Sequence, residues 1–296
     1  MSHPSVSICI VTYLDSEERC RVLEATCRNA LQQRYPNFEV VVSDNAGPVT
    51  AEEALASIED PRLKIFRNEE NLGMAGNMNK CIERCQHDII KMNCDDDLLH
   101  PDFLTLTVPW VDDESLVVTD MEKYIIGTHP EGMDRTVSKD PEVVVREPGY
   151  RYDFWRIKYD ALPGDTLFTK KLHSSLGGYR SGSGVCDWDF AVRARMQKRV
   201  LNIKEKLCFQ GVWDSSLTEK ILKTKPYYFI HSGLFTKFNL LRENSFRLSH
   251  RLHLYTIMFL QLFVAGMRCV RNLNKVEYRS GFRVYWTCFV GSMIEH

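Results

Sequence analysis

The 296-residue chain lacks an apolar run long enough to cross a bilayer. The longest run, residues 254–267, contains Thr256 and Gln261 and falls short of the roughly 20 residues that a spanning helix needs. It is followed and preceded by basic side chains, which suit anionic lipid headgroups. These flanking residues are Arg247, Arg251, Arg268 and Arg271. We expect this run to be either a buried core helix or a helix lying in the plane of a membrane surface.

The chain also lacks an overall excess of charge. Its 38 Lys and Arg residues nearly balance its 39 Asp and Glu residues, so the molecule as a whole is not a general binder of nucleic acid. The balance is uneven along the chain, because the segment from Lys225 onward holds 10 basic and 3 acidic residues. A tail of this kind favours an anionic partner, and we expect contact with an anionic membrane surface and with no nucleic acid.

Features of secreted proteins are missing as well. The opening MSHPSVSICIVTY has no basic n-region, and its apolar residues are typical of a first strand rather than of a signal peptide. Ten cysteines in 296 residues do not make a small disulfide scaffold. We therefore expect the protein in the cytoplasm, either dissolved or peripheral at the inner face of the cell membrane. No internal repeat, Walker loop or Ser-His-Asp arrangement is visible.

The first third of the chain alternates strand and helix patterns. Strands are predicted over residues 5–12, 38–42, 63–66 and 87–92, and helices over 18–33, 51–58 and 71–85. Repeated strand–helix–strand units predict an α/β, Rossmann-like fold with a mainly parallel sheet covered by helices on both faces. Residues 112–163, rich in Gly, Pro and aromatic residues, predict loops with short strands. A further helix is predicted over residues 187–199.

Two domains follow from this pattern. We predict an α/β domain over residues 1–230, with a first half at 1–110 and a second half at 111–230. A basic, helical C-terminal extension is predicted over 231–296, because strand signals fade after residue 228.

Three consecutive carboxylates form the sharpest chemical feature. Asp95, Asp96 and Asp97 follow the apolar strand pattern HDIIKMN. The carboxyl ends of parallel strands are where open α/β sheets bind their ligands. A hard divalent cation would relieve the repulsion between the three charges. The alternative is a solvated acidic turn that caps the next helix.

Four segments in order, SICIVTY, FEVVVSDNAGP, NLGMAGNMNK and IIKMNCDDDLLHPDFL, resemble the family-two glycosyltransferases of the GT-A fold. The resemblance covers residues 5–105, with a second block at 162–218. It implies an inverting, metal-assisted transfer from a nucleoside-diphosphate sugar. It also implies that residues 1–230 are a catalytic domain, in which 1–110 bind the nucleotide sugar and 111–230 bind the acceptor. By resemblance, nucleotide binding is assigned to Thr12, Tyr13, Asp44, Asn71, Gly73, Asn79 and Asp95, and a divalent cation, Mg²⁺ or Mn²⁺, to Asp96 and Asp97.

Alternatives stay open at two of these places. Asp44 would accept a hydrogen bond from the base, or else it forms an Asx-type turn with Asn45 and Gly47. The helix over 71–85 borders the nucleotide, or else it only packs in the core, and Met78 stands where many members have Arg. The family's first acid before the triplet is replaced by Cys94, which is expected to be a small buried hydrophobe because hard cations prefer oxygen.

The second block, PGDTLFTKKLHSSLGGYRSGSGVCDWDFAVRAR, resembles the part of the family that carries the catalytic base. The base corresponds to Asp187, with Cys186 in place of the usual Glu; the alternative is a helix N-cap at Asp187. Asp189 should point elsewhere on the helix. Trp188 is a candidate to stack on an acceptor sugar or a core residue. Trp213 is a second acceptor candidate, in a segment where many members have a histidine that is absent here.

The predicted function is sugar transfer from a nucleoside-diphosphate sugar, most simply a UDP-sugar or dTDP-sugar, to a glycan or a lipid-diphosphate-linked acceptor in polysaccharide synthesis. The alternative is a non-catalytic member that binds sugar nucleotide or glycan as an assembly partner, which Cys186, Met78 and the missing histidine keep open. A nucleotidyltransferase is disfavoured, since TYLDSEER is no Gly-rich basic loop. Cys81 and Cys85 lie on one helix face without a second pair, so no zinc site is expected.

Overall fold

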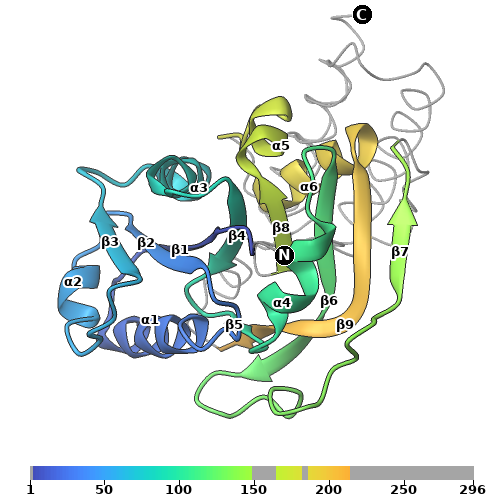
Figure 1. The fold of residues 1–296 in the computed structure, drawn as a ribbon. Coiled ribbons are helices and arrows are strands. Elements are labelled where there is room, and N and C mark those ends of the chain that lie inside the picture. The colour runs from blue at the N-terminus through green and yellow to red at the C-terminus, as the bar shows by residue number, and fades with distance from the viewer. Residues whose placement is uncertain (1–2, 149–164, 182–185, 214–296) are drawn as a thin grey trace, which may run out of the picture. The chain divides into compact units, whose positions relative to one another are not determined.

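The computed structural model describes residues 3–148, 165–181 and 186–213, which belong to one compact unit (Figure 1). The predicted extension over 231–296, with its apolar run 254–267, lies outside the described residues, and so the domain boundary near residue 230 stays a prediction. Within the described ranges, no helix combines the length and apolar character that a bilayer crossing requires.

The first half of the sheet is parallel, as predicted. Strands β1 (Val6–Thr12), β2 (Phe38–Asp44), β3 (Leu63–Arg67) and β4 (Ile89–Cys94) lie in the order β3-β2-β1-β4. All three pairings are parallel. β1 and β2 are completely buried, because helices cover the sheet on both faces, which explains why these strands have continuous rather than alternating apolar sequences.

The second half of the sheet is mixed. β4 pairs antiparallel with β8 (Thr166–Thr169), which pairs antiparallel with β6 (Ser115–Ile125). β6 pairs in parallel with β9 (Arg199–Val212), and β5 (Leu98–Leu99) and β7 (Val143–Arg146) join β9 antiparallel. Nine strands thus form one sheet in the described part of the chain. This arrangement brings the carboxyl-terminal part of β9 beside the end of β4.

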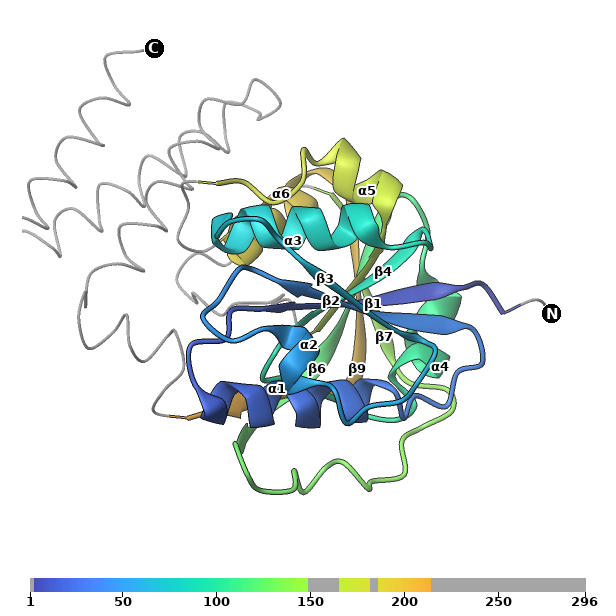
Figure 2. The ribbon, with the colours of Figure 1, turned by 90° about the vertical axis from the view of Figure 1, so that its left-hand side faces the viewer.

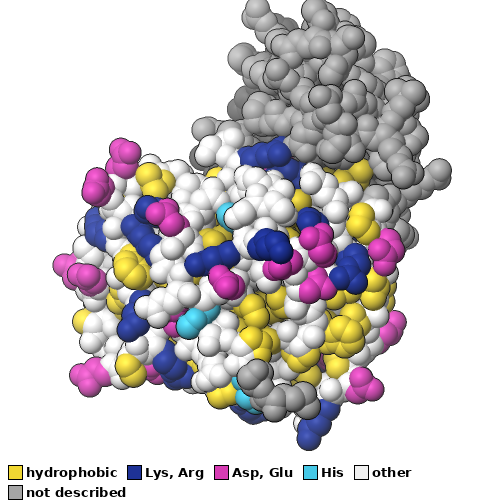
Figure 3. All heavy atoms as spheres, turned by 45° about the horizontal axis from the view of Figure 1, so that its top comes forward, with side chains coloured by type: hydrophobic (Ala, Val, Ile, Leu, Met, Phe, Trp, Pro, Cys, Tyr) yellow, Lys and Arg dark blue, Asp and Glu magenta, His cyan; other side chains and the backbone are white. Residues whose placement is uncertain are grey.

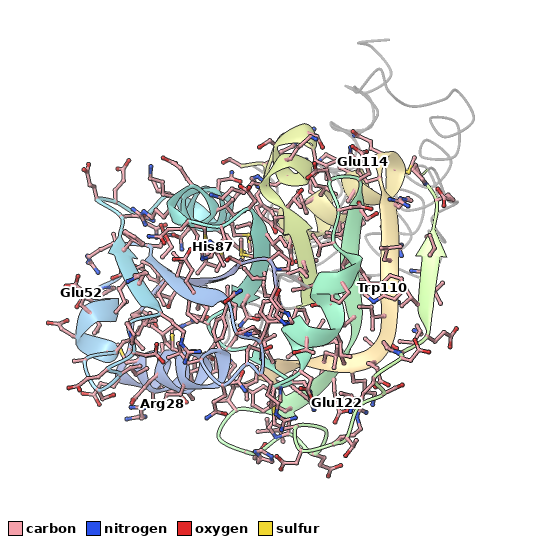
Figure 4. All side chains as sticks on the ribbon, in the orientation of Figure 1. Arg28, Glu52, His87, Trp110, Glu114 and Glu122 are labelled. Atoms are coloured by element: carbon pink, nitrogen blue, oxygen red, sulfur yellow. The ribbon has the colours of Figure 1, made fainter. Side chains whose placement is uncertain are left out.

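The prediction of loops with only short strands over residues 112–163 was wrong for β6, which runs for 11 residues. Its pairing with β9, from a distant part of the sequence, extends it beyond what its local composition indicates. Ion pairs join the two strands, for example Glu122 to Lys206, and a further pair links Glu114 to Lys198, which directly precede β6 and β9. Figure 4 shows both glutamates. Such exposed pairs stabilise little individually.

Helices lie on both sides of the sheet (Figure 2). α1 (Glu17–Ala30), α2 (Ala51–Ala54) and α4 (Phe103–Thr107), with the 3₁₀ turn η1 (Val108–Trp110), cover one face. α3 (Gly73–Arg84), α5 (Lys170–Ser175) and α6 (Cys186–Gln197) cover the other. α2 is shorter than the predicted 51–58, although a capping box between Thr50 and Glu53 fixes its start.

Two apolar clusters hold the layers together, and β1 contributes to both. Ile8 and Ile10 pack in the cluster under α1, whereas Cys9 and Val11 pack in the cluster under α3. This division follows from the two-residue period of a strand. On the surface, positive and negative side chains are interspersed over the described face seen in Figure 3.

Candidate functional site

The carboxyl ends of three adjacent strands bring the predicted donor-site residues to one edge of the sheet. Thr12, the last residue of β1, is in register with Asp44, the last residue of β2. On its other side, Val11 is in register with Cys94, the last residue of β4. Asp95 follows Cys94 directly, and its carboxylate accepts a hydrogen bond from the Thr12 hydroxyl at 2.6 Å. The structure therefore brings Thr12 and the acidic triplet together, as the strand order predicted.

Arg19 also belongs to this site, although it was not among the residues predicted from the sequence. Its Nη1 donates to Asp95 Oδ2 at 3.2 Å, and its guanidinium lies 5.1 Å from the centre of the Trp213 ring. Burial raises the pKa of Asp95, while the nearby positive charge of Arg19 lowers it. A signal was present in the sequence, because Arg19 stands three and four residues before Val22 and Leu23 on the buried stripe of α1.

Asp96 is held from the opposite side by Trp213, which directly follows β9, and by Tyr124 of β6. The Trp213 Nε1–H donates to Asp96 Oδ2 at 3.1 Å, and the Tyr124 hydroxyl donates to the Asp96 carbonyl oxygen at 3.1 Å. Burial and the charge of Asp95 raise the pKa of Asp96 to about 6. The structure thus places Trp213 against the acidic triplet, and its predicted contact with an acceptor sugar stays a prediction.

The position of the Asp97 carboxylate depends on Gly211 of β9. The Gly211 N–H donates to Asp97 Oδ1 at 3.2 Å. A Cβ on Gly211 would collide with the carbonyl oxygen of Asp96, so only glycine permits this close approach of β9 to the triplet. Burial and the charge of Asp96 raise the pKa of Asp97 well above its usual range. Gly211 could not be recognised from the sequence, because its role depends on a contact more than a hundred residues away.

The residues at the triplet fit a hard divalent cation. Potential ligand atoms of Cys94, Asp96 and Asp97 lie within 4.8 Å of one another. Within the described part of the chain, hydrogen bonds engage Oδ2 of Asp96 and Oδ1 of Asp97, which leaves one oxygen of each carboxylate for a ligand. Mg²⁺ and Mn²⁺ prefer such oxygen atoms to a neutral thiol. Cys94 is partly buried, and burial followed by the carboxylates around it raises the pKa of its thiol.

Asp187 is the second residue of α6 and lies partly buried. Its charge contributes to the raised pKa of Cys94, the residue directly before the triplet. Burial also raises the pKa of Asp187 itself, which favours uptake of a proton. Asp189 is turned into the core, where it pairs with buried Arg193 at 2.7 Å. The prediction that Asp189 points elsewhere on the helix is thereby confirmed.

Trp188 is buried, with 4% of its surface exposed. This burial agrees with the core alternative for Trp188 rather than with an open platform for a sugar. Its assignment to the acceptor site rests on the sequence alone.

On the other side of the edge, Asp44 is completely buried. Its Oδ2 accepts hydrogen bonds from the Ala51 backbone N–H at 3.0 Å and from Arg67 at 2.5 Å, and its Oδ1 accepts one from the Gly47 N–H at 3.4 Å. The turn that the sequence left as an alternative is therefore present. Gly47 is required in it, since a Cβ there would lie 2.5 Å from the Leu14 carbonyl oxygen. Tyr13, in contrast, is 39% exposed and presents its ring to solvent.

A chain of asparagine amides joins this turn to α3. Asn45 donates to Asn71 Oδ1 at 2.9 Å, and Asn71 Oδ1 also accepts from the Gly73 N–H. Asn68 donates to both Asn45 and Asn77. The network fixes the loop before α3 beside the ends of β1 and β2, so Asn71 and Gly73 lie next to the Asp44 turn, as the predicted nucleotide site requires.

Asn79 has a different environment. Its Nδ2 donates to the Tyr179 carbonyl oxygen at 2.7 Å, and its Oδ1 accepts from the Tyr179 N–H at 2.9 Å and contacts His173 Nε2 at 3.1 Å. Both polar atoms of the side chain therefore hold the turn that follows α5. The amide therefore makes a structural contact 100 residues along the chain, and the contact of Asn79 with the nucleotide stays a prediction.

Known proteins share this sequence pattern and fold. The sequence signature described as Glycosyl transferase family 2 matches residues 7–173. A Mycobacterium tuberculosis protein, the uncharacterized MT1568, is 22% identical over 232 residues, which are 75% of this chain and 72% of that protein.

Two solved structures extend the comparison. S. aureus TarS in complex with UDP-GlcNAc superposes with a TM-score of 0.68 at 14% identity, over 97% of this chain and 81% of that one. The mannosyltransferase PcManGT from Pyrobaculum calidifontis, in complex with GDP-Man and Mn²⁺, gives 0.60 at 16% identity, over 99% and 87%. At such identities these structures establish the fold.

Proposed function

The chain belongs to glycosyl transferase family 2 and is a glycosyltransferase, and from that premise we propose that it transfers a sugar, with inversion, from a nucleoside-diphosphate sugar to a glycan or lipid-diphosphate-linked acceptor. The observation that carries the proposal is the convergence of Thr12, the acidic triplet and Trp213 at the carboxyl edge of the sheet. Ligands of open α/β sheets bind at this edge. Structural relatives hold UDP-GlcNAc and GDP-Man, which supports a nucleotide sugar as donor.

The donor nucleotide is proposed to lie over the ends of β1 and β2. The exposed ring of Tyr13 can stack on the base. Asn71 and Gly73 border the same turn, and Asp95, oriented by Thr12, faces the ribose. A contact from Asp44 to the base requires the carboxylate to exchange one of its present hydrogen bonds. UDP-sugars and dTDP-sugars remain the donors that we propose.

Asp96 and Asp97 are proposed to hold Mg²⁺ or Mn²⁺ through the oxygen atoms that their hydrogen bonds leave available. When bound, the cation neutralises negative charge on the diphosphate leaving group. The mannosyltransferase relative contains Mn²⁺, which supports this cofactor. The hydrogen bonds from Trp213 and Gly211 orient the two carboxylates before any ligand arrives.

Asp187 is proposed as the general base. The acceptor oxygen forms a bond to the anomeric carbon while the bond from that carbon to the diphosphate oxygen breaks. The acceptor hydroxyl proton moves to Asp187, whose raised pKa favours its uptake. A single in-line displacement inverts the anomeric configuration, through a transition state with oxocarbenium character. In this proposal, residues 111–230 form the acceptor half, and the basic extension over 231–296 contacts the anionic inner surface of the cell membrane.

Thermal unfolding against nucleoside diphosphates, with and without Mn²⁺, tests the donor site. A ligand present at 100 times its Kd adds about 2.7 kcal/mol to the free energy of unfolding. We expect one diphosphate to raise Tm only with the metal, and Asp96→Ala to abolish the rise. Absence of any shift with every diphosphate and metal would favour a non-catalytic assembly partner.

Transfer itself is tested with Asp187→Asn. The variant should keep the metal-dependent rise in Tm but lose about 10²–10⁴-fold in turnover, as expected for a missing general base. The control is Asp113→Asn on the surface, which pairs with Lys171 and should turn over normally. Normal turnover by Asp187→Asn would contradict the assignment.

A further inference from the structure

Three cysteines converge in the core on the α3 side of the sheet, away from the residues used for transfer. The sulfur atoms of Cys9, Cys81 and Cys85 all lie within 4.8 Å of one another, and those of Cys9 and Cys85 are 3.1 Å apart. Cys9 and Cys81 are fully buried and Cys85 is 5% exposed. Sequence spacing paired only Cys81 with Cys85, whereas the fold adds Cys9 from β1.

The fold dictates this convergence. Cys81 lies in the last turn of α3 and Cys85 is the residue that caps its end, four residues later, so the two sulfur atoms lie on the same side of the helix. Cys9 lies in the middle of β1, on the sheet face that packs under α3, because its neighbours Ile8 and Ile10 belong to the opposite face. A one-residue change of register in β1 would remove Cys9 from the cluster.

The chemistry of the cluster selects a soft ligand. Among the described residues, this group of potential ligands contains sulfur only. Structural zinc sites use four ligands in a tetrahedron, so three thiols leave such a site incomplete. Sulfur-only sites favour soft ions over Mg²⁺ or Ca²⁺.

The charge of the site further restricts which ion it can bind. Three bound thiolates carry three negative charges, and the low-dielectric core penalises any uncompensated charge. A monovalent or divalent ion would leave the site negative, whereas a trivalent ion leaves it neutral. The neighbouring charges do not alter this count, because Arg84 acts on Cys81 and Glu39 acts on Cys85 with opposite signs.

We propose that Cys9, Cys81 and Cys85 form a three-sulfur binding site for a soft trivalent ion of the arsenite class. With arsenous acid, three S–As bonds form and three As–O bonds break. The three thiol protons leave with the three hydroxyl groups as water, and no atom changes its oxidation state. The product is uncharged and suits the apolar core. The bound ion would cross-link β1 to the C-terminal end of α3.

Cys85 is the entry point. It is the most exposed of the three and lies at the C-terminal end of α3, where helix ends fray. We therefore expect the Cys85 sulfur to form the first S–As bond. Cys81 and Cys9, whose sulfur atoms lie within 4.8 Å of it, then form the other two.

The test is arsenite binding by the full chain, kept reduced with a phosphine because dithiols chelate arsenic. Cys269 and Cys288, outside the described residues, are first replaced by Ser in a background variant. Intact-protein mass spectrometry should then show one arsenic per chain with the loss of three hydrogens, together with a higher Tm. Cys85→Ala, Cys81→Ala and Cys9→Ala should each weaken binding by more than the roughly 10–100-fold that loss of an outer-shell partner costs a metal site.

Cys27→Ala is the matched control, because Cys27 is a fully buried helical cysteine in the cluster on the other face. It should bind arsenite like the background variant. The proposal is overturned by no bound arsenic, by a loss of only two hydrogens, or by equal binding in Cys27→Ala and Cys85→Ala. If Cys9→Ala does not fold, Cys85→Ala decides the matter, since its side chain is the least buried of the three. Nucleoside-diphosphate binding is not part of the readout, so the outcome is independent of the proposed donor site.

Discussion

The indole N–H of Trp213 donates a hydrogen bond to Asp96 Oδ2, with 3.1 Å between nitrogen and oxygen. The same indole ring lies 5.1 Å from the guanidinium of Arg19, which pairs with Asp95. Two neighbouring carboxylates of the triplet are thus held by two side chains that also contact each other. Carboxylate orientation at this site therefore depends on an α1 residue and on a residue at the end of β9, both distant in the sequence.

Trp213→Phe should weaken the metal-dependent binding of the donor nucleotide. Phenylalanine keeps an aromatic ring near Arg19 but cannot donate to Asp96. A hydrogen bond to a charged group contributes about 1.5–3 kcal/mol, so we expect roughly a tenfold or larger increase in the Kd for Mn²⁺ measured by calorimetry. Trp110→Phe, at an exposed position on η1, is the control and should leave that Kd unchanged. An unchanged Kd in Trp213→Phe would show that the hydrogen bond does not orient Asp96.

Arg19→Met should destabilise the protein most strongly at high pH. The substitution removes the cation that lowers the pKa of Asp95, so the folded-state pKa of this buried carboxyl rises further. A carboxyl whose pKa is raised by folding costs stability above that pKa, and the cost disappears as the pH falls toward the unfolded value. We expect a loss of about 1–3 kcal/mol at pH 8, below the 3–5 kcal/mol of a fully buried pair.

Urea denaturation of Arg19→Met at pH 8 and pH 5 measures this difference. The matched control is Arg21→Met, two residues along α1 and exposed, which should change little at either pH. An equal loss at both pH values would mean that Arg19 stabilises by packing alone and does not compensate Asp95.

The GT-A fold could be predicted because the helices and strands of its first half follow from local sequence patterns. β1 to β4, α1 and α3 arise from apolar runs and helical stripes, and their order determines the parallel half of the sheet. The 11-residue β6 could not be predicted, since its ends follow from pairing with β9. The site residues fall into the same two groups. The positions of Thr12 and the triplet could be predicted because each lies at the end of a strand. Gly211, Tyr124 and Arg19 could not be predicted, because they reach the triplet through contacts between residues distant in the sequence.

Asn79 shows that a motif position does not determine where a side chain points. It stands on the helix that borders the nucleotide site, but a helix has several faces, and this side chain points to the turn at Tyr179. Only the packing of α5 and its following turn against α3 reveals that orientation. The same helix places Asn77 against Ser43 of β2, toward the ends of the strands.

Asp96→Asn should stabilise the metal-free protein at neutral pH while abolishing metal-dependent nucleotide binding. Burial and the charge of Asp95 raise the pKa of Asp96 to about 6. Above that pH the ionised form costs stability, and below it the cost fades toward the unfolded value. Each pKa unit corresponds to about 1.4 kcal/mol, so removing the charge should add about 1–3 kcal/mol at pH 7.5.

Thermal or urea unfolding in a chelator, at pH 7.5 and pH 4.5, measures this gain, which should vanish at the lower pH. Asp120→Asn, an exposed substitution on β6 that only loses an ion pair with Lys204, is the control and should give no gain. A loss of stability in Asp96→Asn at pH 7.5 would show that the hydrogen bond from Trp213 outweighs the repulsion within the triplet.

Gly211→Ala should damage both stability and the donor site. The added Cβ would collide with the Asp96 carbonyl oxygen, which is backbone and cannot rotate away, so β9 and the triplet must separate. Overpacking of this kind costs about 1–3 kcal/mol, and the separation should also lengthen the hydrogen bond from Gly211 N–H to Asp97. The matched control is Gly132→Ala, whose Cβ would meet the ring of Phe209 at 3.0 Å. The ring of Phe209 can move aside, whereas the Asp96 backbone cannot. Gly132→Ala should therefore lower the free energy of unfolding by less than Gly211→Ala and leave Mn²⁺-dependent nucleotide binding intact. If Gly211→Ala binds Mn²⁺ and nucleotide as tightly as the wild type, close packing of β9 on the triplet does not position Asp96 and Asp97.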